Sequence, residues 1–354
     1  MKVWRGKFKL PQKIMRHIAD KRKETVGYPM TLRTYIIRRS ILIIPSFFVI
    51  SLIIFMLIHM APGDPTRIMT GPRGRLPPDV LALMRKELGL DQPLHIQYLQ
   101  WLGRLLQGNF GFSYVSYRPV LDMIGERIFN TLELMLLAEI ASVVVATILG
   151  VIAAVKVHSV PDALASLAAL IGYSIPNFWI ALMAILFFSV QLGWLPVAGL
   201  RSYGAIYNSP IDAWVDHLKH LILPVSILTF GWTAYLFRMV RSSMLDVLGQ
   251  DYITTARAKG LKERIVIYKH ALRNALLPVI TYEGYSIGFL LGGAAVIEYI
   301  FAWPGLGMFM VDIATWRDFP TLMGLSMTIC LMVLVANLCA DIAYALADPR
   351  IRYD

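Results

Sequence analysis

The sequence predicts an all-α integral membrane protein with six transmembrane helices, a cytoplasmic helix-glycine-helix coupling loop, and one sizeable extracytoplasmic region between spans 1 and 2. Three observations predict this class. The 354 residues are 57% hydrophobic and only 16% charged, with a mean hydropathy of +0.59. Several apolar stretches reach the roughly 20 residues that a helix needs to cross a bilayer. The lysines and arginines gather in a few connecting segments, as they do on the cytoplasmic side of membrane proteins.

The composition excludes several other classes of protein. It is too apolar for a disordered chain or an ordinary soluble domain. The net charge is +11, but nucleic-acid binding needs a basic face on a soluble fold, so we expect no nucleic-acid partner. Cys330 and Cys339 fall on opposite faces of one apolar helix, where they can form neither a disulfide nor a metal site. His217 and His220 are fewer ligands than a zinc site needs.

Residues 1–39 are expected to form a basic cytoplasmic tail. They hold twelve lysines and arginines, which attract the anionic headgroups of membrane lipid and keep this end of the chain in the cytoplasm. Residues 40–60 form the first predicted span, in which Pro45 is tolerated. Pro62 and Pro65 then end the helix sharply.

Residues 61–130 make up the extracytoplasmic region. The run Pro77-Pro78-Asp79 predicts the start of a helix that continues through Leu88 and ends at Gly89. The acidic residues and the histidine of this region are scattered along the sequence, so we expect no catalytic constellation in it.

Residues 131–346 form the predicted core, which contains five further spans. Seven lysines and arginines lie between positions 241 and 277, whereas the two short loops of the opposite side carry one each. The coupling loop 241–277, both termini and the tail 347–354 are therefore expected in the cytoplasm. The five apolar segments are Thr131 to Val155, Ala163 to Val190, Leu218 to Phe237, Leu276 to Ile297, and Phe319 to Leu346.

A few polar residues interrupt these spans and mark a predicted translocation passage. Pro176 breaks the third span and frees backbone groups that must face protein or water. Glu283 either extends to the cytoplasmic interface or faces the passage. Two further intramembrane acids are Glu133 and Glu139. All three acids lack the convergent nucleophile, base and donors that a membrane enzyme would need. The residues expected to line the passage are Ser174, Asn177 and Glu283.

Glycines recur every fourth residue in the fifth predicted span. Small residues at this spacing lie on one helix face and let two helix backbones approach closely in a membrane. Gly284, Gly288 and Gly292 are therefore expected to pack against another helix, although glycines in a membrane helix can also be merely tolerated breakers.

The polar segment from Tyr252 to Pro278 has its own helical pattern. A first amphipathic run, beginning at Met244, ends at Gly260, a residue able to take a positive φ after a helix end. A second run continues the pattern after the glycine. One interpretation is a charged loop that holds two interfacial helices. The first run places Met244, Leu245, Leu248, Tyr252 and Ala256 on one face, and the second places Tyr268, Ala271, Leu272, Ala275 and Leu276 on one face.

The sequence ARAKG at Ala256 to Gly260, followed by HALRNALLP at His270 to Pro278, resembles the coupling loop of ABC-importer permeases, most closely the dipeptide/oligopeptide family. The wider superfamily begins this loop with Glu-Ala-Ala, and here the acidic position is Thr254. By this resemblance the residues that couple to the ATPase are Thr254, Thr255, Ala256, Arg257, Ala258, Lys259, Gly260 and Leu261. Further motifs in matching order extend the resemblance over roughly residues 31–354: APGDP, LGLDQPLHIQYLQWLGRLLQGNFGFSY, EYIFAWPGLG and YALADPRIRYD.

The resemblance implies a function in peptide import. The chain would form half of the pathway, beside a second homologous permease subunit, two ATP-binding subunits and an extracellular solute-binding protein in a prokaryotic inner membrane. ATP and magnesium would bind to the partner subunits, because this chain has no GxxxxGK[ST] motif and no catalytic residues are expected in it.

Other functions are also considered. The same family branch imports oligosaccharides or nickel, and the sequence does not separate these substrates from peptides. An ion-coupled secondary transporter would explain the intramembrane acids, but it would usually show inverted repeats with broken half-helices in corresponding positions, which the sequence lacks.

Overall fold

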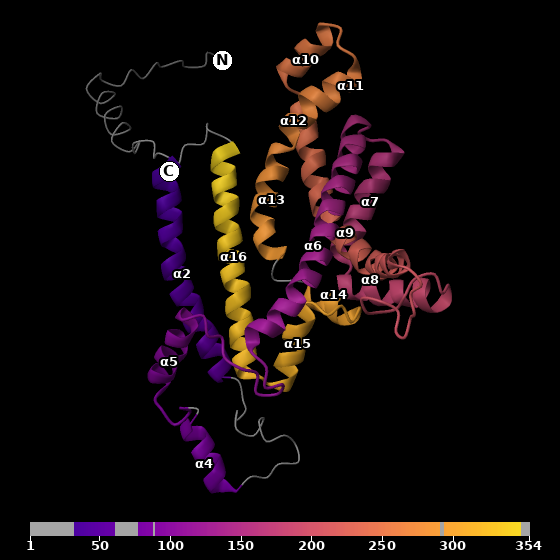
Figure 1. Ribbon diagram of the computed structural model, residues 1–354. Helices are drawn as coiled ribbons and strands as arrows, with labels where there is room; N and C mark the ends of the chain where they lie inside the picture. Colours follow the sequence, from indigo (N-terminus) through magenta and orange to yellow (C-terminus); the bar gives the residue numbers. More distant parts are fainter. Residues whose placement is uncertain (1–31, 61–76, 88, 291–293, 348–354) are drawn as a thin grey trace, which may run out of the picture.

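A computed structural model describes residues 32–60, 77–87, 89–290 and 294–347 of the chain. In these ranges the chain is helical and contains no β-strand (Figure 1). Four described helices are long and apolar enough to cross a membrane. They are α2 (Leu32–Met60), α6 (Val120–Val155), α9 (Pro210–Leu248) and α16 (Phe319–Ala347).

A fifth span is present if a bent pair of helices is counted as one. Helix α7 (Val160–Ser174) is followed by α8 (Asn177–Ala184) and the π-helix η1 (Ile185–Gln191), and the two halves meet at 103°. The break lies at Ile175, which is extended with ψ 130°, and at Pro176, which has no N–H to continue the helix. The predicted interruption of the third span is therefore confirmed.

The remaining predicted span, Leu276 to Ile297, which is the fifth along the chain, stays a prediction. Helix α13 (Leu277–Leu290) has 14 residues and is thus about 21 Å long, shorter than the roughly 30 Å hydrocarbon core of a bilayer. Residues 291–293 lie outside the described ranges, and the short α14 (Ala295–Ile300) follows them.

The long helices extend beyond the apolar segments that predicted them. Helix α6 begins at Val120 instead of Thr131, and α2 begins at Leu32, inside the predicted tail. Helix α9 has 39 residues and begins with a capping box, in which Ser209 and Asp212 bond each other's backbone N–H. Hydropathy marks only the part of a helix that suits the bilayer, so helices that continue through polar residues are predicted too short.

The helices form two groups joined by α13. Helices α2 and α16 lie side by side, α7 and α8 pack against α9, and α6 packs along α9 (Figure 1). A Cβ added at Gly150 of α6 would lie 2.6 Å from a side-chain carbon of Val240 on α9. The backbones of α6 and α9 therefore approach as closely as a residue without a side chain permits.

The short helices lie at opposite ends of the bundle. Helices α10 (Asp251–Ala258) and α11 (Glu263–Ile265) lie at one end, whereas α4 (Pro78–Glu87), α5 (Leu94–Leu106) and α15 (Leu306–Trp316) lie at the other (Figure 1). The helix predicted from Pro78 to Leu88 is α4, and Gly89 follows it with φ 69°. The placement of loop 241–277 and region 61–130 on opposite sides of a membrane stays a prediction.

The buried carboxylate of Glu298 fixes α15 against α6. Its side chain is fully buried and accepts hydrogen bonds from the backbone N–H groups of Gly307 (2.8 Å) and Met308 (3.0 Å) in the first turn of α15. It also accepts from the hydroxyl of Thr131 on α6 at 3.0 Å. A carboxylate at a helix N-terminus satisfies free N–H groups and interacts favourably with the helix dipole. The EYIFAWPGLG motif therefore has a structural role.

The tight packing around this cap predicts that a single methyl group added at Gly307 lowers the stability of the protein. A Cβ there would lie 2.6 Å from the Cα of Ala295, so Gly307→Ala should destabilise the protein by about 2 kcal/mol, as overpacking does. The measurement is thermal unfolding in detergent. Gly125→Ala is the matched control, because its Cβ would meet nothing within 4 Å. Equal melting temperatures for the two variants would contradict the tight cap.

Candidate functional site

The chain between α9 and α13, residues 249–276, is the strongest candidate for a functional site. We refer to it as the α9–α13 segment. Helix α9 stops at Gly249, and Gln250 is extended with ψ 148° before α10 begins. Gly260 takes φ 75° directly after α10, which only glycine adopts at no steric cost. The predicted helix-glycine-helix order is confirmed. After the glycine follow α11, the π-helix η2 (Val266–Ala271) and α12 (Leu272–Ala275).

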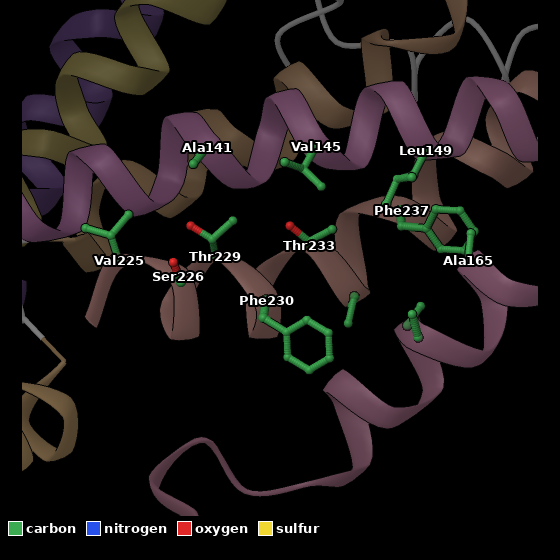
Figure 2. A pocket seen from close by; sticks show the side chains of 13 residues that line it. Ala141, Val145, Leu149, Ala165, Val225, Ser226, Thr229, Phe230, Thr233 and Phe237 are labelled. Atoms are coloured by element: carbon green, nitrogen blue, oxygen red, sulfur yellow. The ribbon is translucent and has the colours of Figure 1, made fainter. Parts of the chain in front are cut away.

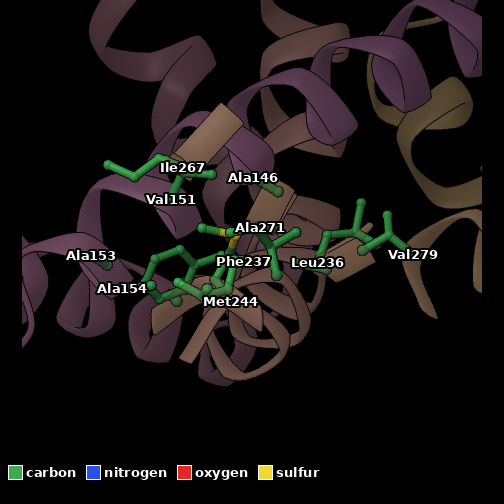
Figure 3. Close-up of a cluster of buried hydrophobic side chains, with 14 of the residues drawn as sticks. Ala146, Val151, Ala153, Ala154, Leu236, Phe237, Met244, Ile267, Ala271 and Val279 are labelled. Atoms are coloured by element: carbon green, nitrogen blue, oxygen red, sulfur yellow. The ribbon is translucent and has the colours of Figure 1, made fainter. Parts of the chain in front are cut away.

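One side of the α9–α13 segment is part of the main hydrophobic core (Figure 3). Ile253 of α10 and Val266 of η2 are fully buried. They belong to one cluster with residues of α6 and α9, including Val151 and Met244. The interpretation of this segment as a charged loop with two interfacial helices is therefore incomplete, because the buried face fastens the segment to the ends of two long helices.

The buried face differs in part from the predicted one. Ala256, Ala271 and Ala275 are buried as expected, but Tyr252 and Tyr268 are 43% and 59% exposed. Around Tyr268 the chain is π-helical, and its wider turn changes which residues share a face. The hydroxyl of Tyr252 instead accepts a hydrogen bond from the side-chain amide of Asn274 at 2.9 Å, which joins the two halves of the segment at its surface.

The other side of the segment is exposed around Gly260. Of the eight residues predicted to couple to an ATPase, only Ala256 is buried, so its small size serves packing against the core. Arg257 forms an ion pair with Glu263 across the glycine turn, 2.7 Å from Nη2 to Oε1. The hydrogen bond from the Arg257 guanidinium lowers the pKa of the Glu263 carboxyl from its usual value. The exposed members are Thr254, Thr255, Arg257, Ala258, Lys259, Gly260 and Leu261.

An ion pair between Arg241 of α9 and the buried Asp162 of α7 links these two helices. The Nε and Nη2 atoms of Arg241 lie 2.6 and 2.8 Å from the two carboxylate oxygens of Asp162. Only 5% of the Asp162 side chain is exposed, and the backbone N–H of His158 donates to it as well. Sequence reasoning missed this pair, although an acidic residue in the first turn of a helix is a recognisable signal.

The predicted passage residues do not meet at one point. Ser174 is exposed at the end of α7. The Asn177 amide packs against α9, where a Cβ on Gly231 would lie 2.9 Å from its Oδ1. Glu283 of α13 lies beside Ser286, which also contacts Glu139 of α6. Among the described residues, Glu283 forms no hydrogen bond or ion pair with Ser174 or Asn177. Their role in a passage stays a prediction.

The intramembrane acids have partners that the sequence did not reveal. Glu133 lies 2.9 Å from Nε2 of His217, a partner on α9. Glu139 accepts a hydrogen bond from Ser286 of α13 at 2.9 Å. Each acid therefore has a polar partner on a helix distant in sequence, which the sequence did not indicate.

Of the three glycines predicted to pack against another helix, the structure shows the surroundings of Gly284. A Cβ on Gly284 would meet nothing within 4 Å, so this position is open within the chain. Nothing is known of the contacts of Gly288, and Gly292 lies outside the described residues. Packing of these glycines against another helix remains a prediction.

A pocket of about 340 Å³ lies between α6, α7 and α9 (Figure 2). Carbon side chains such as Val145 and Phe230 form most of its lining, and hydroxyls of α9 line the rest. The hydroxyl of Thr229 bonds the backbone carbonyl of Ala138 at 3.3 Å, whereas the buried hydroxyl of Thr233 has no hydrogen-bond partner. The pocket suits an apolar group, and sequence reasoning did not indicate it.

The Asp162–Arg241 pair predicts a larger loss of stability than the Arg257–Glu263 pair at the surface. Asp162→Ala would leave a guanidinium unpaired beside a buried site, and breaking such a pair costs about 3 kcal/mol. Glu263→Ala removes an exposed partner, whose contribution is screened by solvent, so its loss should be clearly smaller. Denaturant unfolding of both variants in detergent measures the difference. A loss for Asp162→Ala no greater than that for Glu263→Ala would contradict a structural role for the buried pair.

Comparison with known proteins places these features in a family. Residues 146–353 match the family described as "Binding-protein-dependent transport system inner membrane component", and residues 32–135 match the N-terminal family of the same transport systems. The glutathione transport system permease protein GsiC of Escherichia coli (strain K12) is 41% identical over 319 residues, 90% of this chain and 99% of that protein. The oligopeptide transport system permease protein AppB of Bacillus subtilis (strain 168) is 43% identical over 323 residues, 91% of this chain and 100% of that protein.

A solved structure of the MetNI methionine ABC transporter in an inward-facing conformation is also similar. Its TM-score is 0.48 at 18% sequence identity, and the match covers 64% of this chain and 97% of the other. This similarity is too low to support an argument about the fold.

Proposed function

Because this chain belongs to the binding-protein-dependent transport system inner membrane component family, we propose that it forms half of a translocation passage for peptides in an ABC importer. The family is one of ABC-importer permeases, so the alternative of an ion-coupled secondary transporter is set aside. The two relatives described above carry glutathione and oligopeptide in their names. Peptides are therefore the substrate class that the comparisons favour over oligosaccharides or nickel.

The observation that carries the proposal is the construction of the α9–α13 segment. It exposes a turn of small and basic residues around Gly260 and buries its other face in the core of α6 and α9. A groove on an ATP-binding subunit can receive the exposed turn. The buried face then transmits the movement of that subunit to the helices of the passage, since packed cores move as units and do not deform continuously.

The remaining parts of the proposal concern partners and orientation. A second homologous permease would complete the passage, two ATP-binding subunits would carry ATP and magnesium, and an extracellular solute-binding protein would deliver the substrate. We place the chain in a prokaryotic inner membrane with both termini and the α9–α13 segment in the cytoplasm. The family and the helices able to span a membrane support the membrane location, and the asymmetry of lysine and arginine supports the orientation.

Gly260→Val tests the coupling role through backbone conformation alone. A Cβ at Gly260 would meet nothing within 4 Å, but φ is 75°, a conformation that a β-branched residue avoids. The variant should distort the exposed turn and lower substrate-stimulated ATP hydrolysis and uptake together in the reconstituted complex.

Gly260→Asn is the matched control, because asparagine tolerates a positive φ while adding a side chain of similar bulk. It should keep most of the activity. If Gly260→Val transports as fast as the unmodified chain at equal expression, the turn is not the contact with the ATPase.

A second prediction concerns where substrate selectivity lies. The passage residues Ser174, Asn177 and Glu283 do not converge, whereas a tight binding site needs several polar groups directed at one ligand. Calorimetric titration of peptide into the purified permease and ATPase complex should therefore show no binding unless the solute-binding protein is present. Micromolar or tighter binding without that protein, lost in Asn177→Ala, would contradict this division of roles.

A further inference from the structure

Two carboxyl groups from different helices meet at one serine hydroxyl between α6 and α13. The Oγ atom of Ser286 lies 2.9 Å from Oε1 of Glu139 on α6 and 3.0 Å from Oε2 of Glu283 on α13. It also lies 3.0 Å from the backbone carbonyl oxygen of Glu283. The other carboxyl oxygen of Glu283, Oε1, is buried and has no hydrogen-bond partner.

The hydroxyl of Ser286 has too few hydrogen atoms for its three neighbouring oxygens if both acids are ionised. A serine hydroxyl has one hydrogen to donate, and ionised carboxylates and carbonyls only accept. Three acceptor oxygens within 3.0 Å of one hydroxyl would leave two contacts between lone pairs. A proton on one of the carboxyl groups converts one of these contacts into a hydrogen bond donated to the serine oxygen.

The described residues around the two acids offer no cation to hold two negative charges together. Among the described residues, no lysine, arginine or histidine forms an ion pair with Glu139 or Glu283. The titratable side chains near the two acids are Tyr235 of α9 and Tyr282 of α13, whose rings lie 4.8 Å apart. On the neighbouring α16, Asp341 is paired with Arg39 at 3.3 Å. Two adjacent carboxyl groups in a medium of low dielectric constant cannot both ionise without strong repulsion.

We propose that Glu139 and Glu283 hold one proton between them through Ser286, and that this shared proton fastens α13 to α6. We further infer that transport breaks and remakes this contact between α13 and α6, and this part of the inference rests on the proposed function. Helix α13 follows directly after the α9–α13 segment, and Glu283 lies beyond the core that the segment shares with α6 and α9, so α13 can shift against the middle of α6 while the segment stays fixed to the end of α6. Such a displacement breaks the hydrogen bonds at Ser286 and exposes both carboxyl groups to release of the proton.

The direction of the pH dependence follows from the charges. While the proton is bound, the pair carries one negative charge and the hydrogen bonds hold α6 to α13. When the proton leaves at higher pH, two negative charges repel each other and the contact loosens. Glutamine at either position donates N–H hydrogen bonds and carries no charge, so Glu139→Gln or Glu283→Gln should keep the helices together at any pH.

Infrared spectroscopy of the permease complex in lipid nanodiscs detects the proton directly. At neutral pH the unmodified protein should show a carboxylic-acid C=O stretching band that both Glu139→Gln and Glu283→Gln shift or remove, because each variant replaces one of the two acids that hold the proton. Glu126→Gln is the control, because Glu126 lies on the same helix, is half exposed and pairs with Arg118; it should remove only a carboxylate band.

Ser286→Ala adds a variant that keeps both acids. It should shift the frequency of the acid band, because the bridging hydroxyl is gone while the proton stays. If the difference between the unmodified protein and Glu283→Gln contains carboxylate bands alone, no proton is shared and the proposal is wrong. An unchanged acid band in Ser286→Ala would exclude the bridging role of the serine.

The functional part is measured separately, as peptide uptake by the reconstituted complex over a range of pH. The ratio of uptake to ATP hydrolysed should vary with pH in the unmodified protein and become flat in Glu283→Gln. A flat profile in both proteins would overturn the transport role of the proton. Because the infrared result requires no transport, failure of the shared proton can be told apart from failure of the proposed function.

Discussion

The close approach of α6 and α9 is the constraint on which the rest of the structure depends. The side chain of Val240 lies so close to Gly150 that any side chain at position 150 would collide with it. Small residues such as Ala146 and Ala153 are fully buried on the same helix. In a membrane, helices gain little from the hydrophobic effect and associate through such tight packing. The cluster in Figure 3 builds on this contact and adds the α9–α13 segment to it.

This construction gives the α9–α13 segment two different surfaces. Its buried alanines and aliphatic residues fix it to α6 and α9, and the Asp162–Arg241 pair adds α7 to the same unit. Its exposed turn around Gly260 is free to meet a partner. At its far end the segment continues into α13, which carries Glu283 toward Glu139 of α6. A partner bound at the turn therefore acts on the passage through a core that is already assembled, and the acids lie where α13 must move against α6.

Features encoded in a few consecutive residues could be predicted from the sequence. Pro176 removes a donor and breaks the third span, and Gly260 takes the positive φ that ends α10. Pairings between distant helices could not be predicted, because hydropathy and periodicity describe one segment at a time. The meeting of Glu139 and Glu283 at Ser286 was therefore not predicted. The face that buries Ala271 and exposes Tyr268 was missed for a local reason, since a π-helix departs from the usual 3.6-residue repeat.

The central claim is that the α9–α13 segment and the adjoining ends of α6 and α9 move as one body. Pulsed electron paramagnetic resonance measures this directly, with spin labels on cysteines introduced at the exposed residues Val157 and Lys259 in a background that lacks Cys330 and Cys339. The distance is measured in the full complex without nucleotide and with bound ATP. The account predicts the same distance distribution in both states. A shift of the distribution on ATP binding would show that the segment moves independently of the core and would contradict the account.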